Sequence, residues 1–185
     1  KAESVLIVGV SSSPRNMGRN IVHNLIRWDY PGRMYLMGRK PGNLAGQPIV
    51  TSFDELPDNI DLAVFLTPAE TLPDLVDACG AKGIRWLVIE SGGFSELGEQ
   101  RQQLEDQLVA KAKRWGIRFV GPNGLGALNR AHGLVLPFMS MPRLPAPGRV
   151  SLLAQSGGVG IVYLYALGNE GVGLDKFVSM GNKLS

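Results

Sequence analysis

SVLIVGVSSSPRNMG, residues 4–18, is the stretch that decides the fold. It opens with an apolar run of the kind found in strands that are buried on both faces of a sheet. A loop of small residues follows from Gly9. Residues 19–28 then place apolar side chains on one helix face, with Asn24 opposite and His23 on the same polar side. A strand, a short loop and an amphipathic helix in this order predict the first unit of a parallel α/β sheet.

The alternation of strand and helix continues along the chain. Short apolar runs predict strands, and stretches with helical periodicity lie between the later ones. The further predicted strands are residues 33–38, 61–67, 86–90 and 117–120, and the further helices are residues 72–79 and 99–115. This order predicts a doubly wound, Rossmann-like parallel sheet with helices on both faces. Ligands bind such sheets beyond the carboxyl ends of the strands, so we expect site residues directly after each strand.

The pattern breaks between Gly121 and Gly148. Prolines are frequent in this stretch and indicate a connector rather than a regular element. Beyond it, a strand-like run, a helical stretch and another strand-like run predict the start of a second α/β unit. We therefore expect a first domain at residues 1–130, a proline-rich connector at 131–148 and a truncated second domain at 149–185.

Composition and charge narrow the classes of function. The 185 residues carry a formal net charge of +3, which is small for a nucleic-acid-binding protein and suits an anionic small molecule. No apolar run approaches the ~18 residues of a membrane span, so no membrane association is expected. Cys79 is the only cysteine, which excludes an internal disulfide and indicates the cytoplasm. The chain lacks an initiator Met and ends abruptly, so we expect it to be part of a longer protein.

The loop after the first strand is expected to bind phosphate. Its small residues lead into a helix N-terminus, where free backbone N–H groups and the helix dipole attract anions. The hydroxyls of Ser11, Ser12 and Ser13 could donate as well. The loop is longer than the G-x-G-x-x-G dinucleotide fingerprint and richer in serine. The alternative interpretation is an ordinary turn between strand and helix.

The second predicted strand ends in two cations, Arg39 and Lys40. A domain that binds NAD usually places an acidic residue here, to accept from the ribose hydroxyl. Two cations suit a phosphorylated ribose instead, either the 2′-phosphate of NADP or the 3′-phosphate of coenzyme A. A solvated basic turn is the alternative when the pair is taken alone.

The ends of the later predicted strands supply further candidate ligand-binding residues. Pro68 could form one wall of an adenine pocket, although a role at the start of the following helix explains this proline equally well. Glu90 could hold an amide or hydroxyl of a ligand, or form a structural ion pair with an arginine. Residues 156–158 (SGG) present a second helix N-terminus. His23 and His132 are the only histidines, and with one cysteine they predict no metal site.

Four segments together resemble the coenzyme A-binding domain of the NDP-forming acyl-CoA synthetases. They are GVSSSPRNMG (9–18), GPNGLGALN (121–129), LLAQSGGVG (152–160) and FVSMGNK (177–183), in family-like order and spacing. The family includes the succinyl-CoA synthetase α chain, the ADP-forming acetate–CoA ligases and related protein lysine acetyltransferases. The resemblance covers nearly the whole chain and implies that the second domain begins a flavodoxin-like fold.

The resemblance also implies which residues bind coenzyme A. The loop after the first strand would bind the phosphates of coenzyme A. The cations after the second strand would contact its nucleotide, and the ends of the later strands would contact its adenine and pantetheine. The implied residues are Ser11, Ser12, Ser13, Pro14, Met17, Gly18, Arg39, Lys40, Pro68, Ala69, Ile89, Glu90 and Ser91. Support of a phosphoryl-transfer site is implied for Asn123, Gly124, Ser156, Gly157 and Gly158.

The function implied is the coenzyme A-binding portion of an acid–CoA ligase. In that family a nucleoside triphosphate phosphorylates a mobile histidine, which phosphorylates the acid, and coenzyme A then attacks the acyl phosphate. The resemblance places that histidine beyond Ser185. It also implies that ATP or GTP, with Mg, is bound by an ATP-grasp domain or subunit of an oligomeric parent protein. No catalytic residue is therefore expected in this chain. Two alternatives are an acyl-CoA-sensing domain of a lysine acetyltransferase and an NADP-binding oxidoreductase domain. Family members often have Cys after G-P-N, where this sequence has Gly124.

Overall fold

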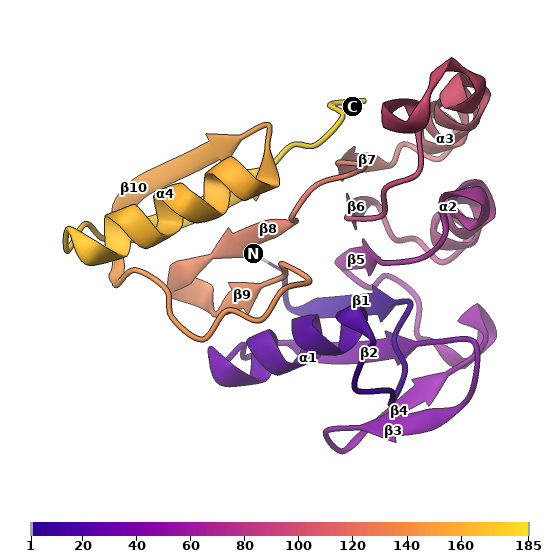
Figure 1. Cartoon of the computed structure of the whole chain (residues 1–185). Coiled ribbons are helices and arrows are strands. Elements are labelled where there is room, and N and C mark those ends of the chain that lie inside the picture. Colours follow the sequence, from indigo (N-terminus) through magenta and orange to yellow (C-terminus); the bar gives the residue numbers. More distant parts are fainter. Residues whose placement is uncertain (1, 185) are drawn as a thin grey trace.

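The computed structural model describes residues 2–184, which form two sheets (Figure 1). The larger sheet has the strand order β3-β4-β2-β1-β5-β6-β7. Its strands are β1 (Ser4–Val8), β2 (Arg33–Met37), β3 (Gly42–Leu44), β4 (Gln47–Val50), β5 (Leu62–Phe65), β6 (Trp86–Ile89) and β7 (Arg118–Val120). Every neighbouring pair is parallel except β3 with β4. The predicted Rossmann-like parallel sheet is confirmed.

Helices cover both faces of the larger sheet. α1 (Met17–Arg27) lies on one face, and α2 (Leu72–Ala81) and α3 (Gln102–Arg114) lie on the other (Figure 1). Because side chains alternate along a strand, β1 contributes to both cores. Val5 and Ile7 pack in the cluster that includes α1, and Leu6 and Val8 pack in the cluster that includes α2 and α3.

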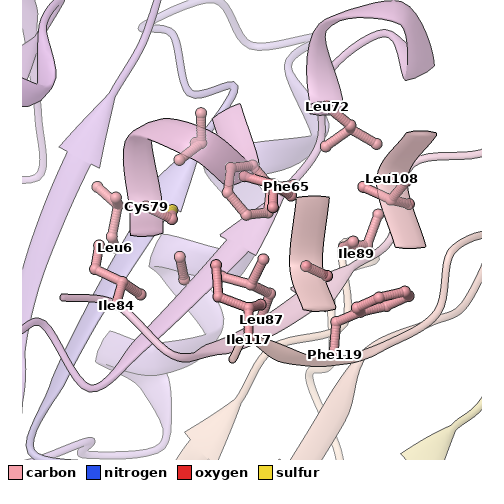
Figure 2. Packing of buried hydrophobic residues seen from close by; sticks show 14 of the residues in the cluster. Leu6, Phe65, Leu72, Cys79, Ile84, Leu87, Ile89, Leu108, Ile117 and Phe119 are labelled. Carbon is pink, nitrogen blue, oxygen red and sulfur yellow. The ribbon is translucent and has the colours of Figure 1, made fainter. Parts of the chain in front are cut away.

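The cluster beneath α2 and α3 fixes the ends of the central strands. Figure 2 shows Phe65, the last residue of β5, and Ile89, the last residue of β6, packed with Leu108 of α3. All three side chains are fully buried, and each contributes about 1.5–3 kcal/mol by leaving water. The residues that directly follow Phe65 and Ile89 are therefore held in place at the carboxyl edge of the sheet.

The smaller sheet has the order β10-β11-β8-β9. Its strands are β8 (Ala127–Asn129), β9 (Leu134–Val135), β10 (Pro147–Ala154) and β11 (Leu174–Ser179). β10 and β11 pair in parallel, and α4 (Gly157–Asn169) connects them. Leu164 of α4 and Phe177 of β11 are buried in one apolar cluster with β8 and β9 residues.

The stretch expected to be a connector contributes to this smaller sheet. β9 lies inside it, and β8 lies inside the expected first domain, yet β8 pairs with β11 near the C-terminal end. Strands of two or three residues are too short to show a periodicity, and prolines surround them. The β3–β4 hairpin was missed for a similar reason. Its turn has positive φ at Ala45 and Gly46, and Asn43 Oδ1 accepts from the Gly46 amide at 3.1 Å.

Asn24 is buried, which corrects its expected place on the solvent face of the first helix. Its side-chain amide donates to the carbonyls of Pro137 and Met139 at 2.9 and 2.8 Å, and its Oδ1 accepts from the Met141 amide at 2.9 Å. The segment after β9 therefore crosses α1 and covers a face that the helix pattern assigned to solvent. His23 is exposed.

The remaining regular elements are short 3₁₀ helices at Phe53–Glu55, Ala69–Thr71, Ser95–Leu97, Glu99–Arg101 and Arg130–His132. Within residues 2–184, every helix is too short or too polar to cross a membrane.

Candidate functional site

Two cavities lie side by side at the carboxyl edge of the larger sheet. The basic cavity, of about 530 Å³, is lined by Gly9, Val10, Ser11, Asn16, Arg39, Lys40, Leu66, Thr67 and Pro68. The central cavity, of about 610 Å³, is lined by Met17, Leu66, Thr67, Pro68, Glu90, Ser91, Gly92, Asn123, Gly124, Leu125, Phe138, Gly157 and Gly158. The segment after β5, residues 66–68, lines both cavities and forms the boundary between them. This is the edge where the sequence predicted a ligand.

Asn16 organises the loop after β1. Its Oδ1 accepts from the amides of Ser11 and Arg19 at 3.1 and 3.0 Å, and its Nδ2 donates to the carbonyl of Gly9 at 2.8 Å. The side chain therefore caps the N-terminus of α1 and ties that helix to the end of β1. The motif analysis did not assign it a role, although an asparagine directly before an amphipathic helix is a cap signal.

Part of the loop remains available to an anion. The amides of Gly9 and Val10 both donate to the carbonyl of Met37, so neither is free to bind an anion. Among the described residues, the amides of Ser12, Met17 and Gly18 have no hydrogen-bond partner. The last two are at the first turn of α1, where the positive end of the helix dipole adds to their attraction for an anion.

Close backbone contact explains the small residues of this loop. Gly9 has φ of +97°, and a Cβ there would lie 2.1 Å from the carbonyl oxygen of Leu66. Any larger residue would separate β1 from the segment after β5. The two chain segments that bound the basic cavity are therefore set directly against each other.

Arg39 and Lys40 give the basic cavity its charge. Both side chains are exposed, and neither takes part in an ion pair within residues 2–184. They follow β2, next to β1 in the sheet, so they face the loop after β1 across the cavity. Free cations next to unpaired backbone amides form an arrangement that binds phosphate groups.

Glu90 is a buried acid in the wall of the central cavity. It is only 4% exposed, and within the described part of the chain neither carboxyl oxygen has a hydrogen-bond partner of normal geometry. Burial raises the pKa of Glu90 well above its usual range, and the backbone amide of Phe138 acts in the opposite direction. Within residues 2–184, Glu90 does not form the ion pair with an arginine that was one of its two predicted roles.

The side chain of the neighbouring Ser91 has a structural role. Its Oγ accepts from the amide of Thr67 at 3.0 Å and lies 3.4 Å from the carbonyl of Phe65. This hydroxyl joins the ends of β5 and β6. By contrast, the hydroxyl of Thr67 is buried and has no partner among the described residues, and sequence reasoning did not single it out.

The central cavity ends at the smaller sheet. Asn123 has φ of +58°, and its amide donates to the carbonyl of Ser91 at 2.9 Å. Gly157 and Gly158 begin α4 on the other side of the cavity, where Ser156 caps the helix through the amide of Val159 at 3.4 Å. Two helix N-termini, those of α1 and α4, therefore reach the same cavity.

Most but not all of the predicted residues come together in this cleft. Ser11, Arg39, Lys40 and Pro68 line the basic cavity, and Met17, Pro68, Glu90, Ser91, Asn123, Gly124, Gly157 and Gly158 line the central one. Seven predicted residues line neither cavity: Ser12, Ser13, Pro14, Gly18, Ala69, Ile89 and Ser156. The side chains of Ala69 and Ile89 are buried in the apolar core, so only their backbone could meet a ligand.

In the part of the chain that the structure describes, the histidines and other potential metal-ligating side chains do not form a second candidate site. No group of three or more His, Cys, Asp or Glu side chains there could hold a metal ion. His132 packs edge-on against Tyr30, beyond the C-terminal end of α1, and its Nε2 lies 2.9 Å from the carbonyl of Ala2.

Residues 3–130 match the protein family described as the CoA binding domain. The chain belongs to this family. Residues 147–185 match a second family, described as the succinyl-CoA ligase like flavodoxin domain. The resemblance that the four motifs predicted is confirmed.

The chain is similar over nearly its whole length to ADP-forming ligases. It is 37% identical, over 98% of its length, to the acetate–CoA ligase [ADP-forming] I subunit alpha of Pyrococcus furiosus. It is 35% identical, over 97% of its length, to the acetate–CoA ligase [ADP-forming] I of Archaeoglobus fulgidus. The chain spans 40% and 26% of these two relatives.

Solved structures with the same fold cover nearly the whole chain. The dinucleotide forming acetyl-coenzyme A synthetase 1 of Ca. Korarchaeum cryptofilum matches 99% of the chain with a TM-score of 0.91 and 30% sequence identity. The chain covers 39% of that structure. PH0766 from Pyrococcus horikoshii matches with a TM-score of 0.90. Because both sheets are included in these alignments, the likeness extends beyond the CoA-binding domain.

Proposed function

We propose that this chain is the coenzyme A-binding portion of an NDP-forming acid–CoA ligase and presents coenzyme A for thioester formation from an acyl phosphate. The observation that carries the proposal is the change of character along the cleft. Its basic cavity holds Arg39 and Lys40, which form no ion pair within residues 2–184, whereas its central cavity is lined by uncharged residues around one buried acid, Glu90. Coenzyme A has the same polarity, with phosphates at one end and a neutral amide chain leading to the thiol at the other.

The cleft suggests how the ligand lies. Arg39 and Lys40 meet the ribose 3′-phosphate, and the amide of Met17, which has no partner among the described residues, meets the diphosphate at the start of α1. Pro68, on the boundary between the cavities, lies against the adenine. The pantetheine arm then runs past Glu90 and Ser91 toward the start of α4.

The relatives also support a proposal for the wider organisation of the protein. We propose a CoA-binding domain at residues 1–130, a connecting segment at 131–148 and the beginning of a flavodoxin-like domain at 149–185. The parent would be a cytoplasmic, oligomeric ligase, with ATP or GTP and Mg bound by an ATP-grasp part outside this chain. In that parent a phosphohistidine phosphorylates the acid. The coenzyme A thiolate attacks the acyl carbon, the C–S bond forms, and the C–O bond to phosphate breaks.

The relatives favour a ligase over the two alternatives. The relatives above whose names state an activity are ligases or synthetases, and the matching families are described as a CoA binding domain and a succinyl-CoA ligase like flavodoxin domain. An acetyltransferase sensor or an NADP-dependent oxidoreductase has no comparable support.

Parallel calorimetric titrations with coenzyme A and NADPH test the proposal. We expect coenzyme A to bind with one-to-one stoichiometry and NADPH to bind at least about tenfold more weakly, because the central cavity suits an amide chain. 3′,5′-ADP should compete with coenzyme A. Equal or tighter binding of NADPH, or no binding of coenzyme A, would overturn the proposed function.

A further inference from the structure

The segment FVSMGNK, residues 177–183, carries part of the family resemblance but has no role in the site described so far. It completes β11 and continues into the segment that follows this strand. There the backbone amide of Asn182 donates to the G-P-N loop, which contributes Asn123 to the lining of the central cavity. The two motifs therefore meet at the wall of this cavity, although 59 residues separate Asn123 from Asn182.

Each motif contains a glycine that lets the other approach. Gly181 has φ of +55°, and a Cβ on it would lie 2.0 Å from the carbonyl oxygen of Pro122. A Cβ on Gly124 would lie 2.8 Å from the carbonyl oxygen of Ser179. Both distances are too short for a real Cβ atom, so a larger residue at either position would push the two segments apart. Gly124, where family members often have Cys, thus suits the close packing of this chain.

Two acids fix the side chain of Asn182. Its Nδ2 donates to Glu96 at 2.8 Å and to Glu105 at 3.1 Å. Burial acts to raise the pKa of Glu96, but hydrogen bonds from Asn182 and from backbone amides outweigh it and lower that pKa, so this acid is ionised at neutral pH. A carboxylate accepts hydrogen bonds and cannot donate them. The NH2 group of Asn182 must therefore face the acids, and its oxygen must face away from them.

The oxygen of Asn182 is directed to Asn123. Asn182 Oδ1 accepts from Asn123 Nδ2 at 3.4 Å. The backbone of Asn123 is held separately, because its amide donates to the carbonyl of Ser91 at 2.9 Å. Asn182 therefore controls the side chain of Asn123 rather than its backbone. The Asn123 Oδ1 lies near Gly92, where a Cβ would be 3.3 Å from it, and both residues line the central cavity.

We propose that Asn182 is a positioning residue of the central cavity, which holds the side-chain amide of Asn123 in one orientation toward the ligand. One N–H of that amide is used by Asn182, and the other N–H and the oxygen remain for the ligand. An amide that is already oriented loses less conformational entropy when a ligand binds, so the contact is stronger. The identity of the ligand, coenzyme A, rests on the proposed function, whereas the positioning of Asn123 does not.

NMR relaxation of the Asn123 side-chain NH2 group tests the positioning without any ligand. We expect an order parameter of about 0.8 in the unaltered chain and below about 0.6 in Asn182→Ala. Asn43→Ala is the matched control, because it removes a side-chain hydrogen bond to the Gly46 amide in the β3–β4 hairpin, which does not line the cavity. It should leave the Asn123 amide as ordered as before. An equally ordered Asn123 amide in Asn182→Ala would overturn the proposal.

A double-mutant cycle supplies a readout that a merely structural role would not move. Calorimetry measures the coenzyme A affinity of the unaltered chain, Asn182→Ala, Asn123→Ala and the double variant. We expect Asn182→Ala to weaken binding about threefold when Asn123 is present and less than about 1.5-fold when Asn123 is already Ala. 3′,5′-ADP, which does not reach the far end of the cleft, should bind all four proteins alike. Circular dichroism and thermal unfolding show whether each variant is folded.

The outcomes distinguish this inference from the proposed function. Equal losses of affinity in both backgrounds would mean that Asn182 only stabilises the fold, and no loss in either would mean that Asn123 does not contact the ligand. Each of these results overturns the role of Asn182 in binding. If the unaltered chain does not bind coenzyme A at all, the proposed function fails, and the order of the Asn123 amide alone then decides whether Asn182 positions it.

Discussion

The side-chain amide of Asn182 donates to Glu96 at 2.8 Å, although 86 residues separate them in the sequence. The same Nδ2 donates to Glu105 at 3.1 Å, and the backbone amide of Asn182 donates to the carbonyl of Pro122 at 2.9 Å. The segment after β11 is therefore bound to the loop after β6 and to the G-P-N loop. These contacts tie the segment after β11 to two loops that line the central cavity.

Replacing Asn182 should destabilise the chain in a specific order. Asn182→Ala removes the shared donor and should cost about 1–2 kcal/mol in the free energy of unfolding. Asn182→Asp should cost more at pH 7, because it places a third carboxylate beside Glu96 and Glu105. Denaturant unfolding at pH 7 measures both. An Asp variant as stable as the Ala variant would show that these acids do not share the amide.

Reversing the charge of Lys40 should weaken coenzyme A binding through one phosphate. We expect Lys40→Glu to raise the dissociation constant for coenzyme A by about tenfold or more, and to leave that for 3′-dephospho-coenzyme A nearly unchanged. Lys113→Glu, an exposed lysine on α3, is the matched control for net charge. If Lys40→Glu weakened both ligands equally, the assignment of Lys40 to the ribose phosphate would be wrong.

Gly9→Ala should destabilise the chain far more than Gly46→Ala. Both glycines have positive φ, at +97° and +81°, but a Cβ on Gly9 meets the carbonyl of Leu66, whereas a Cβ on Gly46 meets nothing within 4 Å. We expect about 1–2 kcal/mol for Gly46→Ala, from backbone strain alone, and more than about 3 kcal/mol for Gly9→Ala. Thermal unfolding of the pair checks this. Equal losses would mean that β1 and the segment after β5 separate freely.

Asn24→Leu should cost about 2–4 kcal/mol of unfolding free energy. The substitution leaves the carbonyls of Pro137 and Met139 and the amide of Met141 without their partner. His23→Ala, one residue earlier on the exposed face, should change stability by less than about 0.5 kcal/mol. A loss below about 1 kcal/mol for Asn24→Leu would show that the loop over α1 is held by other contacts.

The buried carboxyl of Glu90 should make stability fall as pH rises. Its pKa is higher in the folded chain than the ordinary value of 4.5, so the full stability is present below about pH 4.5 and declines between that pH and the folded pKa. Glu90→Gln does not titrate and should lack this decline. Urea unfolding of both proteins from pH 5 to pH 8 measures the difference. Parallel curves would mean that Glu90 ionises as easily in the folded chain as in the unfolded one.

The parallel sheet could be predicted from sequence because each central strand is a continuous apolar run followed by a loop of small or polar residues. The rule that ligands bind at the carboxyl ends of parallel strands also assigns Glu90 and Lys40 to the correct edge of the sheet. These predictions depend on local pattern and on one general rule of topology.

The parts that could not be predicted depend on contacts distant in sequence. Asn24 sits on a helix face that reads as polar, and only the path of the segment after β9 shows that this face is covered. β8 and β9 are too short to show a periodicity, and the pairing of β8 with β11 and of β9 with β8 depends on tertiary contacts. The bond between Asn182 and Glu96 joins two loops whose proximity no local pattern encodes.

A crystal structure of the chain with coenzyme A tests the central claim most directly. The account predicts the ribose 3′-phosphate beside Arg39 and Lys40, the adenine against Pro68, the diphosphate at the N-terminus of α1, and the amide arm beside Glu90. A ligand bound at the amino edge of the sheet, near Arg85 and Trp86, or bound in the reverse direction along the cleft, would contradict it.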